Sequence, residues 1–151
     1  MSQFDEPVYS PRLRMHQGRK EIFDPVRNKY VALTPEEHVR QHFIHYLITE
    51  KKIPCSLLAV EASLKYNSLV KRCDIVVYGT SGKPLLIIEC KAPSVEVGGE
   101  VFQQVAMYNF SLKVRYLVVT NGNRTFACEV DHETGAVKFL DDIPEYEAMN
   151  I

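Results

Sequence analysis

The hydrophobic positions of residues 34–52 recur with the period of a helix. At 100° per residue, one arc of this segment collects Val39, Phe43, Ile44, Tyr46, Leu47 and Ile48. Thr34 is a suitable N-cap, Pro35 fits the first helical position, and Glu37 stands where a capping box places its acid. The pattern therefore predicts a helix that begins directly after Thr34.

Runs rich in aliphatic residues follow this helix and favour strands. The expected strands cover residues 55–64, 72–78, 84–92, 114–122, 125–130 and 136–140. A turn at "GTSGK" joins the second strand to the third, and a second helix is expected from about Glu100 to Leu112. Ahead of the first helix, residues 20–32 predict a small hairpin around "DPVRN". This order predicts an α/β fold with a central mixed β-sheet flanked by helices.

Length and composition favour one domain over residues 1–151, with 46% hydrophobic and 25% charged residues. We expect a basic N-terminal extension over about 1–33, a core over about 34–122, and a C-terminal hairpin with an acidic tail over 123–151. The apolar runs are far shorter than the ~20 residues of a membrane-spanning helix. With no secretory leader and no Cys-x-x-Cys spacing, we expect a cytoplasmic protein with reduced cysteines and no membrane partner.

Charge is distributed unevenly, although the formal net charge is only -1. Residues 12–29 carry six basic and two acidic side chains, whereas residues 128–151 carry seven acidic and one basic. This asymmetry indicates one face for an anion and another turned away from it. Two ordinary solvated surfaces are an equally good interpretation of charge alone.

The stretch "LLIIECKAP", residues 85–93, places charge at the end of a strand that is otherwise apolar. If the preceding hairpin pivots between Ser81 and Gly82, residues that face each other have numbers summing to 163. Asp74 then lies opposite Glu89, and both carboxylates converge beside Lys91. The same alternation predicts that Cys73 and Cys90 lie together on the opposite face.

Two carboxylates at that separation repel each other unless one is protonated or a cation lies between them. Mg²⁺ suits the position, because it prefers oxygen ligands and often binds through one or two carboxylates. Lys91 would then hold or activate a water that attacks phosphorus. From the pattern alone, a structural ion-pair cluster of these residues with Arg72 has equal weight.

The segment "RCDIVVYGTSGKPLLIIECKAP" resembles the core of the PD-(D/E)XK nuclease superfamily. "RNKYVALTPEEHVRQHFIHYLI" and "FQQVAMYNFSLKVRYLVVTNG" narrow the resemblance to the N-terminal nuclease domain of type I restriction enzyme R subunits. The resemblance runs from about Arg27 to Gly122, in the family's order. It implies a restriction-endonuclease-like core and Mg²⁺-dependent hydrolysis of phosphodiester bonds in DNA, with Mn²⁺ as a substitute.

The resemblance also implies roles for individual residues. Asp74 and Glu89 match the metal-binding acids, and the backbone carbonyl of Cys90 would be a third ligand. Lys91 matches the catalytic lysine. Gln104 and Tyr108 match the glutamine-x-x-x-tyrosine motif of these R subunits, and a spacing of four places them on one helix face.

Many superfamily members bring a further glutamate from the first helix to the metal. We favour Glu36 for this auxiliary role, because it lies within the apolar arc while Glu37 is expected to bind Thr34 in the capping box. Arg40, one turn further on, would neutralise Glu36. Glu61 either approaches the site or faces solvent, and the pattern does not decide between the two.

The leading hypothesis is a stand-alone Mg²⁺-dependent DNA endonuclease whose residues 12–29 and Lys91 contact phosphates. The rival hypothesis is a non-catalytic module that keeps the nuclease fold and binds DNA or a motor protein. The family's R subunits continue into helicase motor domains, and these 151 residues contain none. We therefore expect no ATP-driven translocation, and we expect a separate motor or specificity subunit, or a homodimer, as candidate assemblies.

Overall fold

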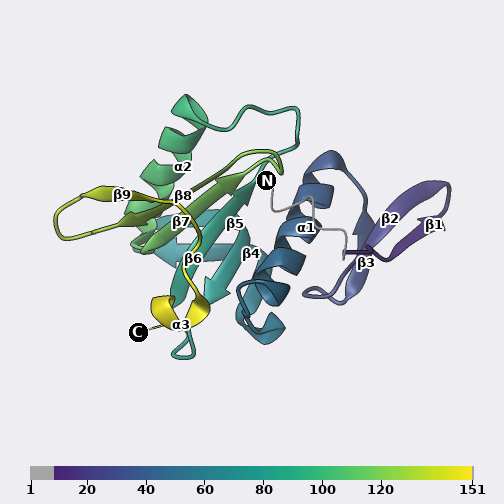
Figure 1. Cartoon of the computed structure of the whole chain (residues 1–151), viewed down its shortest axis with the longest axis horizontal. Helices are drawn as coiled ribbons and strands as arrows, with labels where there is room; N and C mark the ends of the chain where they lie inside the picture. The colour runs from purple at the N-terminus through teal and green to yellow at the C-terminus, as the bar shows by residue number, and fades with distance from the viewer. Residues whose placement is uncertain (1–8, 151) are drawn as a thin grey trace.

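The structure is a computed structural model that describes residues 9–150, apart from the side chains of Val105, Tyr108 and Asn109. Its centre is a six-stranded sheet in the order β4-β5-β6-β7-β8-β9 (Figure 1). The strands are β4 (Leu58–Tyr66), β5 (Leu69–Tyr78), β6 (Pro84–Cys90), β7 (Tyr116–Thr120), β8 (Thr125–Val130) and β9 (Val137–Leu140). Strands β6 and β7 are parallel, and the other neighbouring pairs are antiparallel. The predicted α/β fold with a central mixed sheet is confirmed.

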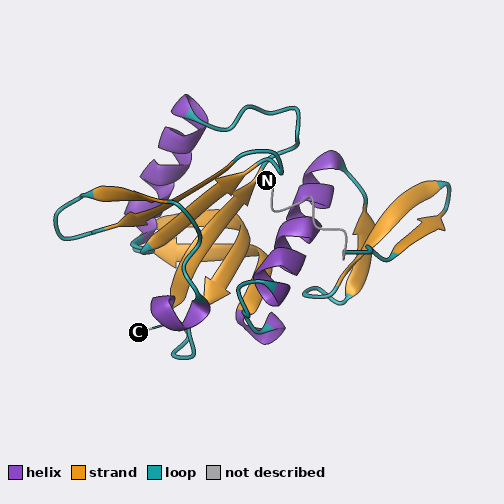
Figure 2. Cartoon of the chain, viewed as in Figure 1, coloured by secondary structure: helices purple, strands orange, loops and turns teal. Residues whose placement is uncertain are grey.

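Helices α1 (Pro35–Thr49) and α2 (Gly99–Leu112) pack on opposite faces of this sheet (Figure 2). The core under α1 contains Phe43, Leu47, Ile75, Ile88 and Val118, among others. The core under α2 contains Phe102, Leu112, Val76, Ile87 and Val119, among others. Because strand side chains alternate between the two faces, covering both faces accounts for the unbroken apolar runs of the central strands.

A second, three-stranded antiparallel sheet precedes α1, where the sequence predicted only a hairpin. Strands β2 (Arg19–Asp24) and β3 (Lys29–Ala32) form that hairpin, and β1 (Leu13–His16) adds a third strand. Gln17 and Gly18 join β1 to β2 with φ values of 51° and 76°, as a tight hairpin turn requires. Every residue of β1 is exposed, so no alternation of buried and exposed positions marks it in the sequence. Figure 1 shows β1 and β2 extending away from the central sheet.

Two short elements, one before the central sheet and one in the C-terminal tail, were not predicted from the sequence. The expected strand at residues 55–64 opens with a 3₁₀ turn, η1 (Cys55–Leu57), before β4 begins. A short helix, α3 (Tyr146–Met149), lies in the acidic tail. Met149 and Ile143 are buried in the core on the α1 side, so the apolar residues of this tail close that core. Within residues 9–150, no helix combines the length and apolar character needed to cross a membrane.

Candidate functional site

The ends of β5 and β6 bring the two predicted metal-binding acids together. Cross-strand pairs such as Ile75 with Ile88 have numbers that sum to 163, which confirms the predicted register. The paired ladder stops there, one position before Asp74 and Glu89. At that point Asp74 Oδ2 accepts a hydrogen bond of 2.8 Å from the backbone N–H of Cys90. The Asp74 carboxylate is therefore fastened to the strand that carries Glu89.

The carboxyl group of Glu89 is buried and incompletely satisfied. The residue is only 6% exposed, and its Oε1 has no hydrogen-bond partner in the described part of the chain. Burial, followed by the nearby charge of Asp74, raises the pKa of Glu89 to about 7, against the opposing effects of Lys71 and Lys91. A buried carboxyl beside a second carboxylate is the electrostatic situation that a bound cation would relieve.

The two cysteines do not share a face, so that prediction is wrong. Cys90 packs in the core under α1, whereas Cys73 packs in the core under α2. The reason is a break in the β4–β5 ladder beside Asp74, where Val60–Ile75 and Ala62–Cys73 pair regularly on either side of an unpaired step. Such an irregularity changes which side chains point to each face. Burial raises the pKa of the Cys73 thiol to about 12, as expected for an inert, packed cysteine.

Glu61 occupies the break opposite Asp74, and its backbone is left-handed with φ of 53°. This region is uncommon for residues other than glycine and concentrates at functional sites. The Glu61 carboxylate bonds Arg72 Nη2 at 2.6 Å and Arg40 Nη1 at 3.4 Å. The sequence pattern left the position of Glu61 open. A β4–β5 hairpin that turns between Asn67 and Ser68 would place Glu61 opposite Asp74, in the same register as the pairs on either side.

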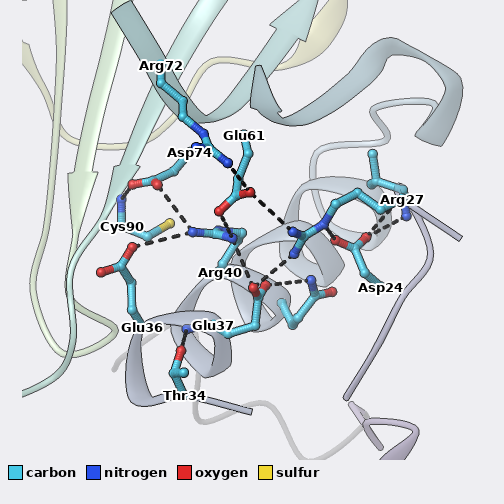
Figure 3. A network of polar contacts seen from close by, with 12 residues as sticks. Asp24, Arg27, Thr34, Glu36, Glu37, Arg40, Glu61, Arg72, Asp74 and Cys90 are labelled. Atoms are coloured by element: carbon cyan, nitrogen blue, oxygen red, sulfur yellow. Dashed lines mark hydrogen bonds and ion pairs between the residues drawn. The ribbon is translucent and has the colours of Figure 1, made fainter. Parts of the chain in front are cut away.

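Arg40 lies at the centre of the charged groups that join α1 to the sheet (Figure 3). Its side chain is 5% exposed and contacts four carboxylates. Nη1 lies 2.9 Å from Glu37 and 3.4 Å from Glu61. Nη2 lies 3.3 Å from Asp74 and 3.4 Å from Glu36. A single guanidinium thus pairs with acids from three different elements, which is possible because its donors are arranged in a fixed fork.

The side chains of Glu36 and Glu37, at the start of α1, do not lie where the sequence predicted. Thr34 caps the helix by accepting a hydrogen bond from the Glu37 backbone N–H at 3.0 Å. The buried Glu37 carboxylate does not close a capping box; it accepts hydrogen bonds from Arg27, Arg40 and Gln41 instead.

Glu36 lies outside the buried arc, with 46% of its side chain exposed. Burial and the charge of Asp74 raise its pKa, against Arg40 and Lys91. Glu36 shares Arg40 Nη2 with Asp74, and its metal role stays a prediction.

Lys91 directly follows β6, and its backbone N–H donates to the carbonyl of Thr120 at 2.8 Å. Its charge opposes the rise in pKa of both Glu36 and Glu89. Gln104 belongs to the opposite helix, α2, where it is exposed and lines a surface groove with Leu69 and Met107. The side chain of Tyr108 lies outside the described residues. The structure therefore gathers the two acids, Lys91 and Glu36, while Gln104 makes no hydrogen bond to them in the described part of the chain.

The residues present fit a hard divalent cation that keeps several waters. Among residues 9–150, no three His, Cys, Asp or Glu side chains lie close enough to hold a metal ion by themselves. Asp74 and Glu89 nevertheless supply two adjacent carboxylates, and one buried oxygen of Glu89 lacks a partner. Mg²⁺ commonly binds through one or two carboxylates with water completing its octahedron. These two carboxylates therefore suit Mg²⁺ better than an ion whose ligands all come from the protein.

The protein has a mixed sheet between two helices, with acids at the ends of two adjacent strands and a lysine directly after the second strand. This arrangement defines a restriction-endonuclease-like α/β domain. Residues 35–144 match the family model described as type I restriction enzyme R protein N terminus. The chain belongs to this family, and the resemblance predicted from the sequence is confirmed.

One solved structure with the same fold is a fragment of a putative HsdR subunit of a type I restriction enzyme from Vibrio vulnificus YJ016. The two share 21% sequence identity with a TM-score of 0.56 over 78% of this chain. The match covers 24% of that chain, so the protein spans about a quarter of its length. No curated protein matches the sequence.

Proposed function

We propose that the protein is a Mg²⁺-dependent DNA endonuclease of the PD-(D/E)XK type, which hydrolyses phosphodiester bonds and accepts Mn²⁺ as a substitute. The observation that carries the proposal is the buried carboxyl oxygen of Glu89, which has no hydrogen-bond partner in the described part of the chain and lies beside Asp74, two positions before Lys91. Membership of the R protein N-terminal family supports the same chemistry.

Each residue has a specific role in this proposal. Asp74, Glu89 and the backbone carbonyl of Cys90 would hold the cation, which when bound supplies Lewis-acid stabilisation of charge on the phosphate oxygens. The Lys91 ammonium would orient the attacking water and balance the negative charge that develops during attack. Glu36, which shares Arg40 Nη2 with Asp74, would accept a hydrogen bond from a water of the site.

The exposed arginines of the N-terminal sheet are the proposed contacts for the DNA backbone. Arg12 stacks over the ring of Phe23 at 4.5 Å. Arg14 stacks over Tyr30 at 4.1 Å and pairs with Glu21 at 2.7 Å, yet its side chain stays 43% exposed. Arg27 lies within the predicted phosphate-contacting residues 12–29, but it is not a proposed contact. Its side chain is only 17% exposed and is paired with Asp24, Glu37 and Glu61. Phosphate contacts of this kind predict binding that weakens steeply with salt.

A nicking assay on supercoiled plasmid and on branched DNA, with Mg²⁺ or Mn²⁺, tests the proposal. We expect Asp74→Ala and Lys91→Ala to reduce metal-dependent nicking by at least about a hundredfold. Lys83→Ala is the matched control, because Lys83 is an exposed lysine in the turn at the other end of β6. Absence of metal-dependent cleavage on both substrates, or equal activity of all three variants, would contradict the nuclease proposal.

The second candidate is a non-catalytic module that binds DNA or a separate motor or specificity subunit. The ion pairs of Arg40 with Asp74 and Glu36 favour it, because they neutralise the acids without a metal. This candidate predicts that DNA is retained in a gel-shift assay without cleavage and that retention does not depend on Mg²⁺. A homodimer stays a prediction that sedimentation would test.

A further inference from the structure

The two terminal nitrogens of Arg40 are held with different strengths. Nη1 makes a short contact of 2.9 Å with Glu37, one turn away on the same helix. Nη2 makes two longer contacts, of 3.3 Å with Asp74 and 3.4 Å with Glu36. Hydrogen bonds weaken as they lengthen beyond about 3.2 Å. Arg40 is therefore anchored on the Glu37 side and bound more loosely on the side of the candidate metal site.

The two oxygens of Asp74 are likewise unequal. Oδ2 accepts the 2.8 Å hydrogen bond from the Cys90 N–H, so the backbone fixes it. Oδ1 faces Arg40 Nη2. A cation that bridges Asp74 and Glu89 needs an oxygen of Asp74, and it would stand next to a buried guanidinium of the same charge. Because like charges repel strongly in a partly buried site, Nη2 and a metal compete for this carboxylate.

Glu61 can hold the Arg40 side chain in place when a metal displaces it from Asp74. Its Oε1 lies 3.4 Å from Nη1, which leaves room for a shorter contact, and Arg72 holds its Oε2. Glu61 and Glu37 therefore offer two acceptors to Nη1 that do not involve Asp74.

We propose that Arg40 is the resident counter-ion of the metal-free site. Its Nη2 releases Asp74 and Glu36 when a divalent cation binds, while its Nη1 stays on Glu37 and Glu61. Arg40 is thus a positioning residue that sets metal affinity, and this inference rests on the proposed function only in placing a cation at Asp74 and Glu89.

Calorimetric titration of the whole chain with Mg²⁺ and Mn²⁺ tests the competition. We expect Arg40→Gln to bind metal at least about fivefold more tightly than the native chain. Arg72→Gln is the matched control, because Arg72 also pairs with Glu61 and its loss changes the charge equally. Arg72 makes no ion pair with Asp74 among the described residues, so we expect its loss to change affinity by less than about twofold.

A second measurement uses the native chain and does not depend on the folding of a variant. Arg40 Nε is buried without a hydrogen-bond partner in the described chain. The resonance of its N–H therefore reports a movement of the guanidinium and not the breaking of a hydrogen bond at Nε. During Mg²⁺ titration we expect this resonance to shift with the same midpoint as the calorimetric curve. Arg40→Lys adds a variant that keeps the charge and loses the fork, and we expect it also to bind metal more tightly.

The outcomes separate this inference from the proposed nuclease function. Equal metal affinity of the Arg40 and Arg72 variants, or a stationary Arg40 resonance while metal binds, overturns the inference and leaves the nuclease proposal intact. Tighter metal binding by Arg40→Gln, together with no DNA cleavage by the native chain, supports the inference and removes the nuclease proposal. If no variant and no native chain binds either metal, both are overturned.

Discussion

Helices α1 and α2 cover opposite faces of one sheet, but they differ in how deeply their polar residues are buried. In α1, Glu37, Arg40 and Gln41 are buried and bonded to one another. In α2, Gln103 and Gln104 are exposed. Helix α1 also begins at the side-chain cap of Thr34, whereas no side chain caps α2 at Gly98. The α1 face therefore combines charge chemistry with packing, and the α2 face keeps the two apart.

This difference has an energetic consequence. Buried ion pairs add little net stability, because desolvation offsets their attraction, yet removing one partner leaves a buried charge uncompensated. Substitutions on α1 should thus change folding and metal chemistry together. Substitutions at exposed positions of α2 should leave folding unchanged, so any loss of activity there is a direct effect.

Arg40→Leu should lower the free energy of unfolding by about 3–5 kcal/mol, because Glu37 and Asp74 lose their shared buried cation. Urea denaturation followed by circular dichroism measures it. Arg72→Leu, at a side chain that is 68% exposed, should change stability by less than about 1 kcal/mol. Similar losses for the two variants would remove the distinction between a buried and a surface role.

Glu89→Gln should stabilise the protein in a pH-dependent way. Folding raises the pKa of Glu89 from 4.5 to about 7, so the folded state binds this proton more tightly than the unfolded state. Native stability therefore falls as pH rises from 4.5 to 7. The substitution should add roughly 3 kcal/mol above pH ~7.5 and almost nothing near pH ~4.5. Urea unfolding at both pH values checks this, and a gain that is equal at both would contradict it.

Thr34→Ala should lower the free energy of unfolding by about 1 kcal/mol, because it removes the acceptor for the Glu37 backbone N–H. Thermal denaturation at fixed pH measures the change. Thr49→Ala is the matched control at the exposed end of α1, where the hydroxyl donates to the His45 carbonyl rather than capping the N-terminus. We expect a smaller change there, and the reverse order would contradict the role of Thr34 as cap.

Gln104→Ala should leave stability within about 0.5 kcal/mol of the native value, because the side chain is exposed. If Gln104 acts in catalysis as the family resemblance predicts, nicking should nevertheless fall by roughly tenfold or more. Gln103→Ala, at the adjacent exposed glutamine, is the matched control and should retain activity. Equal nicking by the two variants would remove Gln104 from the proposed site.

Features that depend on residues close together along the chain could be predicted from the sequence. The period of apolar residues and the cap at Thr34 located α1, and the tight turn at residues 79–83 fixed the β5–β6 register to the residue. That register was enough to bring Asp74 beside Glu89, because a hairpin pairs residues by counting outward from its turn. The family resemblance followed from the same local segments.

The ion pairs of those acids could not be predicted from the sequence, because they join distant parts of the chain. Arg40 meets Asp74 across 34 positions and Glu61 across 21, and the sequence offers no local pattern that links them. The break at Glu61 likewise separated the two cysteines onto different faces, which strict alternation did not anticipate. Burial supplies the physical reason: a side-chain charge inside the fold must find its partner wherever packing brings one, and packing depends on how α1 rests against the sheet.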